Sequence, residues 1–190
     1  MSTVVIAHAH IRTDALDSVT DYLAEARAAL AQQVGFRAMD VYYRSEAEPE
    51  QLLLLTLYDD ADTAEAGLAV LTEERLTLTE RGLVDTTSDI SRMETFRQIG
   101  AASGAVVSLS RRTADPGRGQ ELIEDVADVM DSLSAIGGFL GALVGPNESM
   151  PEQVFGLAFW DNYFAYNESL PAQLVYEVTP YMAWPPPQVN

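Results

Sequence analysis

Residues 35–62, GFRAMDVYYRSEAEPEQLLLLTLYDDAD, contain the pattern that decides the fold. The glycine that opens this stretch is the usual residue just beyond the end of a helix. Two runs rich in branched and aromatic residues, 36–44 and 51–58, predict strands, and the acidic, proline-containing residues 45–50 predict a turn between them. Three aspartates within residues 59–62 predict the start of another helix, since carboxylates are favoured at its positive end.

The residues on either side extend this pattern to six elements. Residues 3–12 (TVVIAHAHIR) alternate in character and predict a half-buried strand. A helix is expected next, with Thr13 or Asp14 as its N-cap and its end at Gly35. Its apolar positions recur at helical spacing at Leu16, Val19, Tyr22, Leu23, Ala26 and Leu30. The second helix is expected to run through residue 71 and in pieces to 81, and a fourth strand near 91–97 completes the order βαββαβ.

The same order recurs in the second half of the chain. Asp115 predicts an N-cap with Pro116 at the first helical position, and an apolar stripe then ends at Gly137-Gly138. The expected strands cover residues 105–111, 139–144, 154–160 and 174–182, with a short helix from 161 to about 170.

Three matched landmarks relate the two halves to each other. They are Gly35-Phe36 with Gly138-Phe139, Leu57-Tyr58-Asp59 with Phe159-Trp160-Asp161, and Val4-Val5 with Val106-Val107. Each pair lies about a hundred residues apart, which is the length of one βαββαβ domain. The fold class predicted is α+β, with ferredoxin-like domains in tandem over residues 1–100 and 104–184. The small residues 100–104 (GAASG) are expected to link them, and residues 185–190 form a proline-rich tail.

In each βαββαβ unit the third strand ends in an aromatic and an acidic residue and leads straight into a helix. This pattern, repeated in both units, resembles a known family. The chain is similar to the antibiotic-biosynthesis monooxygenase-like members of the dimeric α/β-barrel superfamily. The resemblance implies an intrachain pseudo-dimeric α/β barrel, with small ligands bound between sheet and helices. Known members include cofactor-free oxygenases acting on polycyclic aromatic phenols and haem-degrading oxygenases, so the fold alone does not name a function.

Composition excludes several classes of partner and chemistry. The formal charge is −18, with 29 acidic residues and 11 basic residues that are all arginine. Such a chain repels phosphate backbones and anionic lipid surfaces, so we expect neither nucleic-acid nor membrane binding. Cysteine is absent, which excludes disulfides and thiolate chemistry. Without an N-terminal basic region or an apolar run of about 20 residues, a cytoplasmic location is expected, and formation of a homo-oligomer remains open.

The two histidines, His8 and His10, are the first candidates for chemistry. Side chains two apart on a strand share a face, so this pair could hold a metal if carboxylates converged on it. Hydrogen-bonded histidines at the barrel interface are the favoured alternative. The haem-degrading relatives place a histidine on the second helix, whereas none follows His10 here. We therefore expect no bound haem, metal or other cofactor, while free reduced flavin as a co-substrate remains open.

An imidazole could instead act as a general base that deprotonates a phenol, leaving an electron-rich phenolate to react with oxygen. Arg12 lies on the same strand face and could stabilise the oxyanion; pairing with surface carboxylates is the alternative. Candidate ligand-binding residues are the aromatic and amide side chains Tyr22, Tyr42, Tyr58, Trp160, Asn162 and Tyr163. The alternative is that many of the aromatic residues only fill the core.

The leading functional hypothesis is a cofactor-independent oxygenase acting on a small aromatic or polyketide-like molecule. The alternative is a non-catalytic protein that binds a small ligand or a partner. In a third reading one domain binds ligand and the other only completes the barrel.

Overall fold

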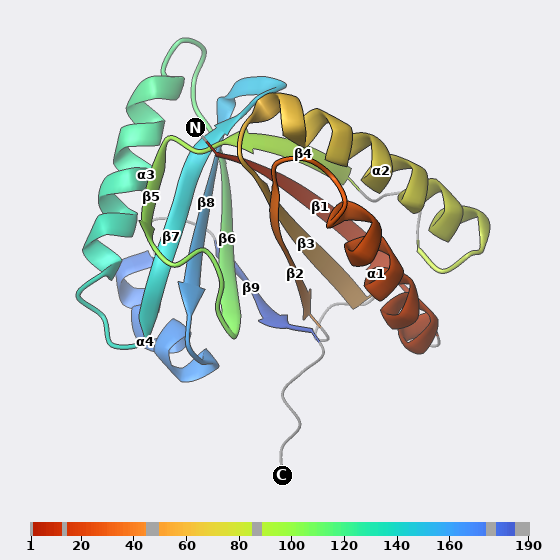
Figure 1. Ribbon diagram of the computed structural model, residues 1–190. Coiled ribbons are helices and arrows are strands. Elements are labelled where there is room, and N and C mark those ends of the chain that lie inside the picture. Colours follow the sequence, from red (N-terminus) through yellow and green to blue (C-terminus); the bar gives the residue numbers. More distant parts are fainter. Residues whose placement is uncertain (1, 13–14, 45–49, 85–88, 174–177, 185–190) are drawn as a thin grey trace. The chain divides into compact units, whose positions relative to one another are not determined.

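The computed structural model describes residues 2–12, 15–44, 50–84, 89–173 and 178–184 (Figure 1). The chain forms two compact units, Met1–Arg92 and Met93–Asn190. The linker predicted at residues 100–104 lies within the second of these units, a few residues after the boundary. The strand Arg97–Gly100 accounts for this position, because it pairs with a strand of the second unit. The proline-rich tail at 185–190 lies outside the described residues.

The first unit has the ferredoxin-like order of elements. These are β1 (Thr3–Ile11), α1 (Leu16–Leu30), β2 (Phe36–Arg44), β3 (Glu50–Tyr58), α2 (Ala61–Glu80) and β4 (Asp89–Glu94). The strands lie in the order β4-β1-β3-β2, and β3 pairs antiparallel with both β1 and β2. The helices α1 and α2 cover one face of this sheet (Figure 1).

The second unit repeats this order and adds one strand. Its elements are β5 (Arg97–Gly100), β6 (Val106–Thr113), α3 (Gly119–Leu133), β7 (Phe139–Asn147), β8 (Met150–Trp160), α4 (Tyr163–Gln173) and β9 (Val178–Ala183). The strand order is β9-β6-β8-β7-β5, so the first four strands match those of the first unit and β5 extends the edge at β7.

The glycines predicted to end the first helix of each unit do so in the left-handed conformation. Gly35 has φ +75° and Gly138 has φ +82°. In both units the carbonyl of this glycine accepts a hydrogen bond from the residue that follows the third strand, Asp59 or Asp161, at 2.9 Å. These glycines suit the turn because only glycine adopts a positive φ without steric cost.

The aromatic residues of the two landmarks also have equivalent surroundings. The Tyr58 ring meets the Phe36 ring edge-on at a centroid distance of 6.0 Å. The Trp160 ring meets the Phe139 ring in the same way at 5.4 Å. Such edge-to-face contacts add stability beyond that gained by burying apolar area. Here they hold the start of each second strand against the end of the third.

The starts of the helices test the capping predictions. Asp60 caps α2, as its side chain accepts a hydrogen bond from the Thr63 amide at 2.9 Å. The prediction that Asp115 caps α3 is wrong. That helix begins at Gly119, and the Asp115 carbonyl accepts a hydrogen bond from the Arg118 amide at 3.0 Å. Proline followed by a glycine at φ +80° forms a tight turn there, which is the alternative meaning of an Asp-Pro-Gly sequence. Thr13 and Asp14, the expected caps of α1, lie outside the described residues.

We predict that Gly35→Ala destabilises the protein more than Gly82→Ala. Both glycines have positive φ, but a Cβ at Gly35 would lie 2.6 Å from the Thr63 side chain, whereas nothing lies within 4 Å at Gly82. Gly82→Ala should lower the free energy of unfolding by about 1–2 kcal/mol, the cost of a left-handed non-glycine residue. Gly35→Ala should lower it by at least about 1 kcal/mol more through the clash. Urea denaturation measures both, and equal losses would contradict the assignment of Thr63 as a steric neighbour.

Candidate functional site

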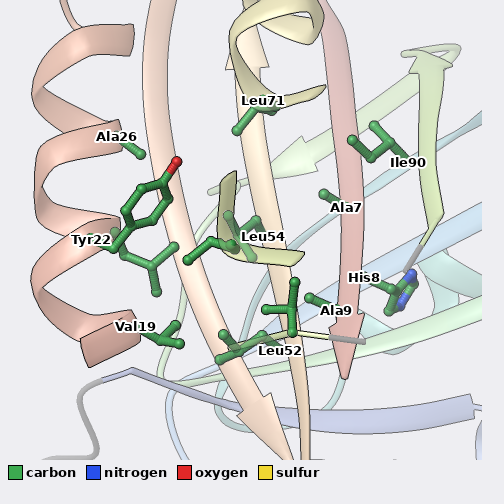
Figure 2. A pocket seen from close by; sticks show the side chains of 13 residues that line it. Ala7, His8, Ala9, Val19, Tyr22, Ala26, Leu52, Leu54, Leu71 and Ile90 are labelled. Carbon is green, nitrogen blue, oxygen red and sulfur yellow. The ribbon is translucent and has the colours of Figure 1, made fainter. Parts of the chain in front are cut away.

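A cavity lies between the sheet and the two helices of the first unit (Figure 2). Its volume is about 50 Å³. Alanines at positions 7 and 9 of β1 and leucines at 52 and 54 of β3 form its floor, and these residues are direct cross-strand neighbours. Short alanine side chains leave space that a larger residue on this strand would fill. The strand alternation predicted from the sequence thus supplies the floor, and the cavity lies between sheet and helices, where the resemblance implies ligand binding.

Tyr22 provides a polar group at the wall of this cavity. Its ring projects from α1 over the floor, and its side chain is largely buried. The hydroxyl points toward the end of the cavity where Ala26 and Leu71 lie (Figure 2). Within the described residues this hydroxyl has no hydrogen-bond partner. A buried hydroxyl without a partner is unfavourable, so it is suited to pair with a polar group of a ligand.

His8 borders the same cavity from β1 and is held by a carboxylate. Its Nδ1 lies 3.1 Å from Oδ1 of Asp89 on β4. In Figure 2 its ring lies on the side of β1 away from Tyr22. Ile90 lines the cavity, whereas Asp89, its neighbour in the strand, faces the opposite side of the sheet. A histidine oriented by a carboxylate has the arrangement of a general base.

The remaining candidates on the first sheet do not line the cavity. Tyr42 is buried on β2 in the same cross-strand row as His8, with Leu53 between them. His10 Nε2 lies 3.4 Å from the side-chain amide nitrogen of Gln51, and Arg12 is exposed at the end of β1. The structure therefore places His8 and His10 on the same face of β1, opposite the cavity floor. His8 is among the residues that line the cavity, but its ring points to the other side of the strand.

Tyr58 lies on the helix-covered face of β3, beyond the cavity. Its side chain is fully buried and its hydroxyl has no hydrogen-bond partner in the described part of the chain. Burial disfavours the phenolate and raises the pKa of Tyr58 to about 12. This tyrosine is therefore neutral over the physiological range.

The candidates of the second unit have structural partners. Trp160 is fully buried, and its indole N–H donates to Ser108 Oγ at 3.1 Å. Asn162 accepts a hydrogen bond from the Ala165 amide at 2.9 Å and so caps α4. The Tyr163 ring is partly exposed and packs against the Tyr166 ring at 5.5 Å. These three side chains are not brought together around a cavity, and their role in ligand binding stays a prediction.

No group of three histidine, aspartate or glutamate side chains that could hold a metal ion occurs among the residues that the structure describes.

Comparison with known proteins agrees with the resemblance found in the sequence. Residues 2–68 match the family model described as antibiotic biosynthesis monooxygenase. A search of curated proteins gave no match. The fold of the whole chain is shared by several solved structures, all at low sequence identity.

Three of these structures cover almost all of both chains. An anthrone oxidase-like protein aligns with a TM-score of 0.73 at 12% identity, over 96% of this chain and 91% of its own. A monooxygenase-like protein of Listeria innocua aligns with a TM-score of 0.61 at 10% identity, over 100% and 96%. A ferredoxin fold protein of Listeria monocytogenes, related to antibiotic biosynthesis monooxygenases, aligns with a TM-score of 0.58 at 10% identity, over 96% and 94%. The predicted tandem ferredoxin-like fold class is confirmed.

We predict that Tyr58→Phe makes the stability of the protein less sensitive to alkaline pH. The pKa of Tyr58 is about 12 in the folded protein, against about 10 in an unfolded chain. The stability that this neutral tyrosine contributes is complete below pH 10 and is lost as pH rises toward 12, because only the unfolded chain ionises there. The loss amounts to about 2–3 kcal/mol for a shift of this size. Urea titrations of both proteins at pH 8 and pH 11.5 measure it, and identical pH dependence would contradict the buried position.

Proposed function

We propose that this tandem protein, which resembles the antibiotic biosynthesis monooxygenases, is an oxygenase-like enzyme that binds a small phenolic aromatic molecule in the first unit. The observation that carries the proposal is an apolar cavity between sheet and helices, with a carboxylate-held histidine on the other face of the strand that forms its floor. Aliphatic walls favour aromatic rings, since burial of apolar area gives about 25 cal/mol per Å². The Tyr22 hydroxyl supplies a hydrogen bond to an oxygen of the ligand.

The cavity must widen to admit several fused rings. Its volume of about 50 Å³ is well below the roughly 300–1,000 Å³ usual for ligand pockets. Its walls come from α1, from α2 and from the sheet. Outward movement of the helices, or rotation of Tyr22, would enlarge it without breaking the sheet.

His8 would act as the general base for a substrate whose reacting group reaches the face of β1 on which this ring lies, opposite the cavity floor. It removes the proton of a phenol or of an activated ring CH₂, and Asp89 stabilises the imidazolium that forms. The resulting anion is electron-rich and reacts with O₂. For an anthrone-type substrate, one oxygen atom becomes the new ring carbonyl, and the other leaves as water with the two hydrogens of the CH₂ group. This balance needs no further reductant. The description of one structural neighbour as anthrone oxidase-like supports this choice of substrate class.

A non-catalytic ligand-binding protein is the second candidate. It is supported by the small number of polar side chains at the cavity, where Tyr22 and His8 stand among aliphatic residues. Binding of a phenol without oxygen consumption would favour it.

No helix of the described residues is long and apolar enough to cross a membrane. The cytoplasmic location expected from the sequence stays a prediction.

We predict that His8→Gln lowers kcat for oxidation of 1,8-dihydroxyanthrone by about 100-fold or more, since it removes a general base. Asp89→Asn should lower it less, because the imidazole remains. Glu94→Gln is the matched control, an exposed carboxylate on the same strand as Asp89. Oxygen uptake, corrected for autoxidation, measures the rates, and His10→Gln tests the other histidine of this strand. Equal rates for His8→Gln and wild type would rule out His8 as the base.

We also predict that Ala9→Leu abolishes binding of phenolic aromatics while the protein stays folded. The added branch fills the cavity floor between α1 and the sheet. Tyr22→Phe should weaken binding of the same ligand by about fivefold, the loss of one hydrogen bond of about 1 kcal/mol. Equilibrium dialysis measures both affinities, with circular dichroism as the test of folding. Unchanged binding to Ala9→Leu would place the ligand elsewhere.

A further inference from the structure

A row of buried hydroxyls continues from the cavity along the helix-covered face of the first sheet. Thr3, Thr56 and Tyr58 are buried, and none of their hydroxyls has a hydrogen-bond partner within the described residues. Thr3 lies directly opposite Tyr58 in the pairing of β1 with β3. We call Thr3, Thr56 and Tyr58 the hydroxyl row.

The hydroxyl row is continuous with the cavity. Thr56 and Tyr58 follow Leu52 and Leu54 at alternate positions of β3, so all four side chains point to the same face. The Tyr22 hydroxyl points toward the Leu71 end of the cavity (Figure 2), and that is the end from which the row continues.

The helix above the hydroxyl row presents little side-chain bulk. Leu71 of α2 lines the cavity, and Gly67 lies one turn before it. A Cβ at Gly67 would overlap the Tyr58 hydroxyl, so this phenol end reaches the helix backbone. Ala64, three residues before Gly67 on the same helix, has a small side chain and is also buried. A modest outward movement of α2 would therefore open the row to a ligand already in the cavity.

The second unit uses the equivalent space differently. Trp160, which matches Tyr58, donates to Ser108, and Ser108 donates to Gln173 Oε1 at 3.4 Å. Gln173 in turn donates to Ser169, so the polar groups under α4 have partners. Trp160 and the apolar residues of α3 belong to one packed core. Val106 lies opposite Trp160 in the second unit, as Thr3 lies opposite Tyr58 in the first. The position that matches Ser108 is therefore Val5, whose side chain cannot accept a hydrogen bond.

We propose that the hydroxyl row is the polar edge of the binding site, and that it pairs with oxygen substituents of an extended aromatic ligand, bound once per chain in the first unit. The inference rests on the proposed function and makes its substrate class narrower. Rings of the ligand occupy the aliphatic cavity, while its hydroxyl or carbonyl groups meet Thr56 and Tyr58. A hydrocarbon of the same shape gains nothing from the row.

The test compares two ligands of the same ring system, 1,8-dihydroxyanthraquinone and anthracene. The double variant Thr56→Val with Tyr58→Phe removes two hydroxyls and keeps the shape of both side chains. Its affinity for the dihydroxyanthraquinone should fall by about fivefold for each hydroxyl lost, and its affinity for anthracene should stay within about twofold. The free variant should unfold at a higher temperature, because buried hydroxyls without partners are gone. Ser108→Ala, in the second unit, is the control and should leave both affinities unchanged.

The outcomes separate this inference from the proposed function. If both ligands bind but the double variant binds them as wild type does, or loses both equally, the hydroxyl row is not the polar edge and the cavity proposal stands. A stoichiometry of two ligands per chain would overturn the single site. If neither ligand binds to wild type, the proposed function fails, and this inference fails with it.

Discussion

The backbone hydrogen bond from Asp59 to Gly35 fixes the geometry on which the first unit depends. It ties the end of β3 to the turn after α1, so the chain enters α2 at a defined point above the sheet. Asp60 then caps α2 with its carboxylate, and the helix covers the side of the sheet that carries the cavity. The bond between Asp161 and Gly138 has the same role in the second unit. Each unit thus places two helices over its sheet through one short turn.

The two units differ in what fills the space under those helices. In the second unit a tryptophan and a set of hydrogen-bonded polar side chains complete a packed core. In the first unit, alanines at positions 7 and 9 leave a cavity, and several hydroxyls are without partners within the described residues. Packing and hydrogen bonding, rather than the course of the backbone, make one unit the better candidate for binding.

The fold could be predicted because its signals are local. A glycine after a helix, alternation along 3–12 and an aromatic-acidic pair before a helix each reflect the conformation of a few adjacent residues. The site could not be predicted to the same extent. The partner of Trp160 lies 52 residues away in the sequence, and nothing local showed that its indole N–H would be satisfied. Asn162 was considered for ligand binding, although an asparagine three residues before a backbone amide is also a helix cap. At Asp115 two local signals, cap and turn, competed, and the turn prevailed.

Joining both units in one chain has a consequence for symmetry. In a dimer of identical subunits every substitution occurs twice, so both sites change together. Here Tyr58 and Trp160 occupy matched positions, yet each is encoded separately. One copy can therefore accumulate residues that favour rigidity, such as the Trp160 and Ser108 pair, while the other keeps a cavity and buried hydroxyls without partners among the described residues. Because the two fused units have separate sequences, one can become more stable while the other stays more adaptable.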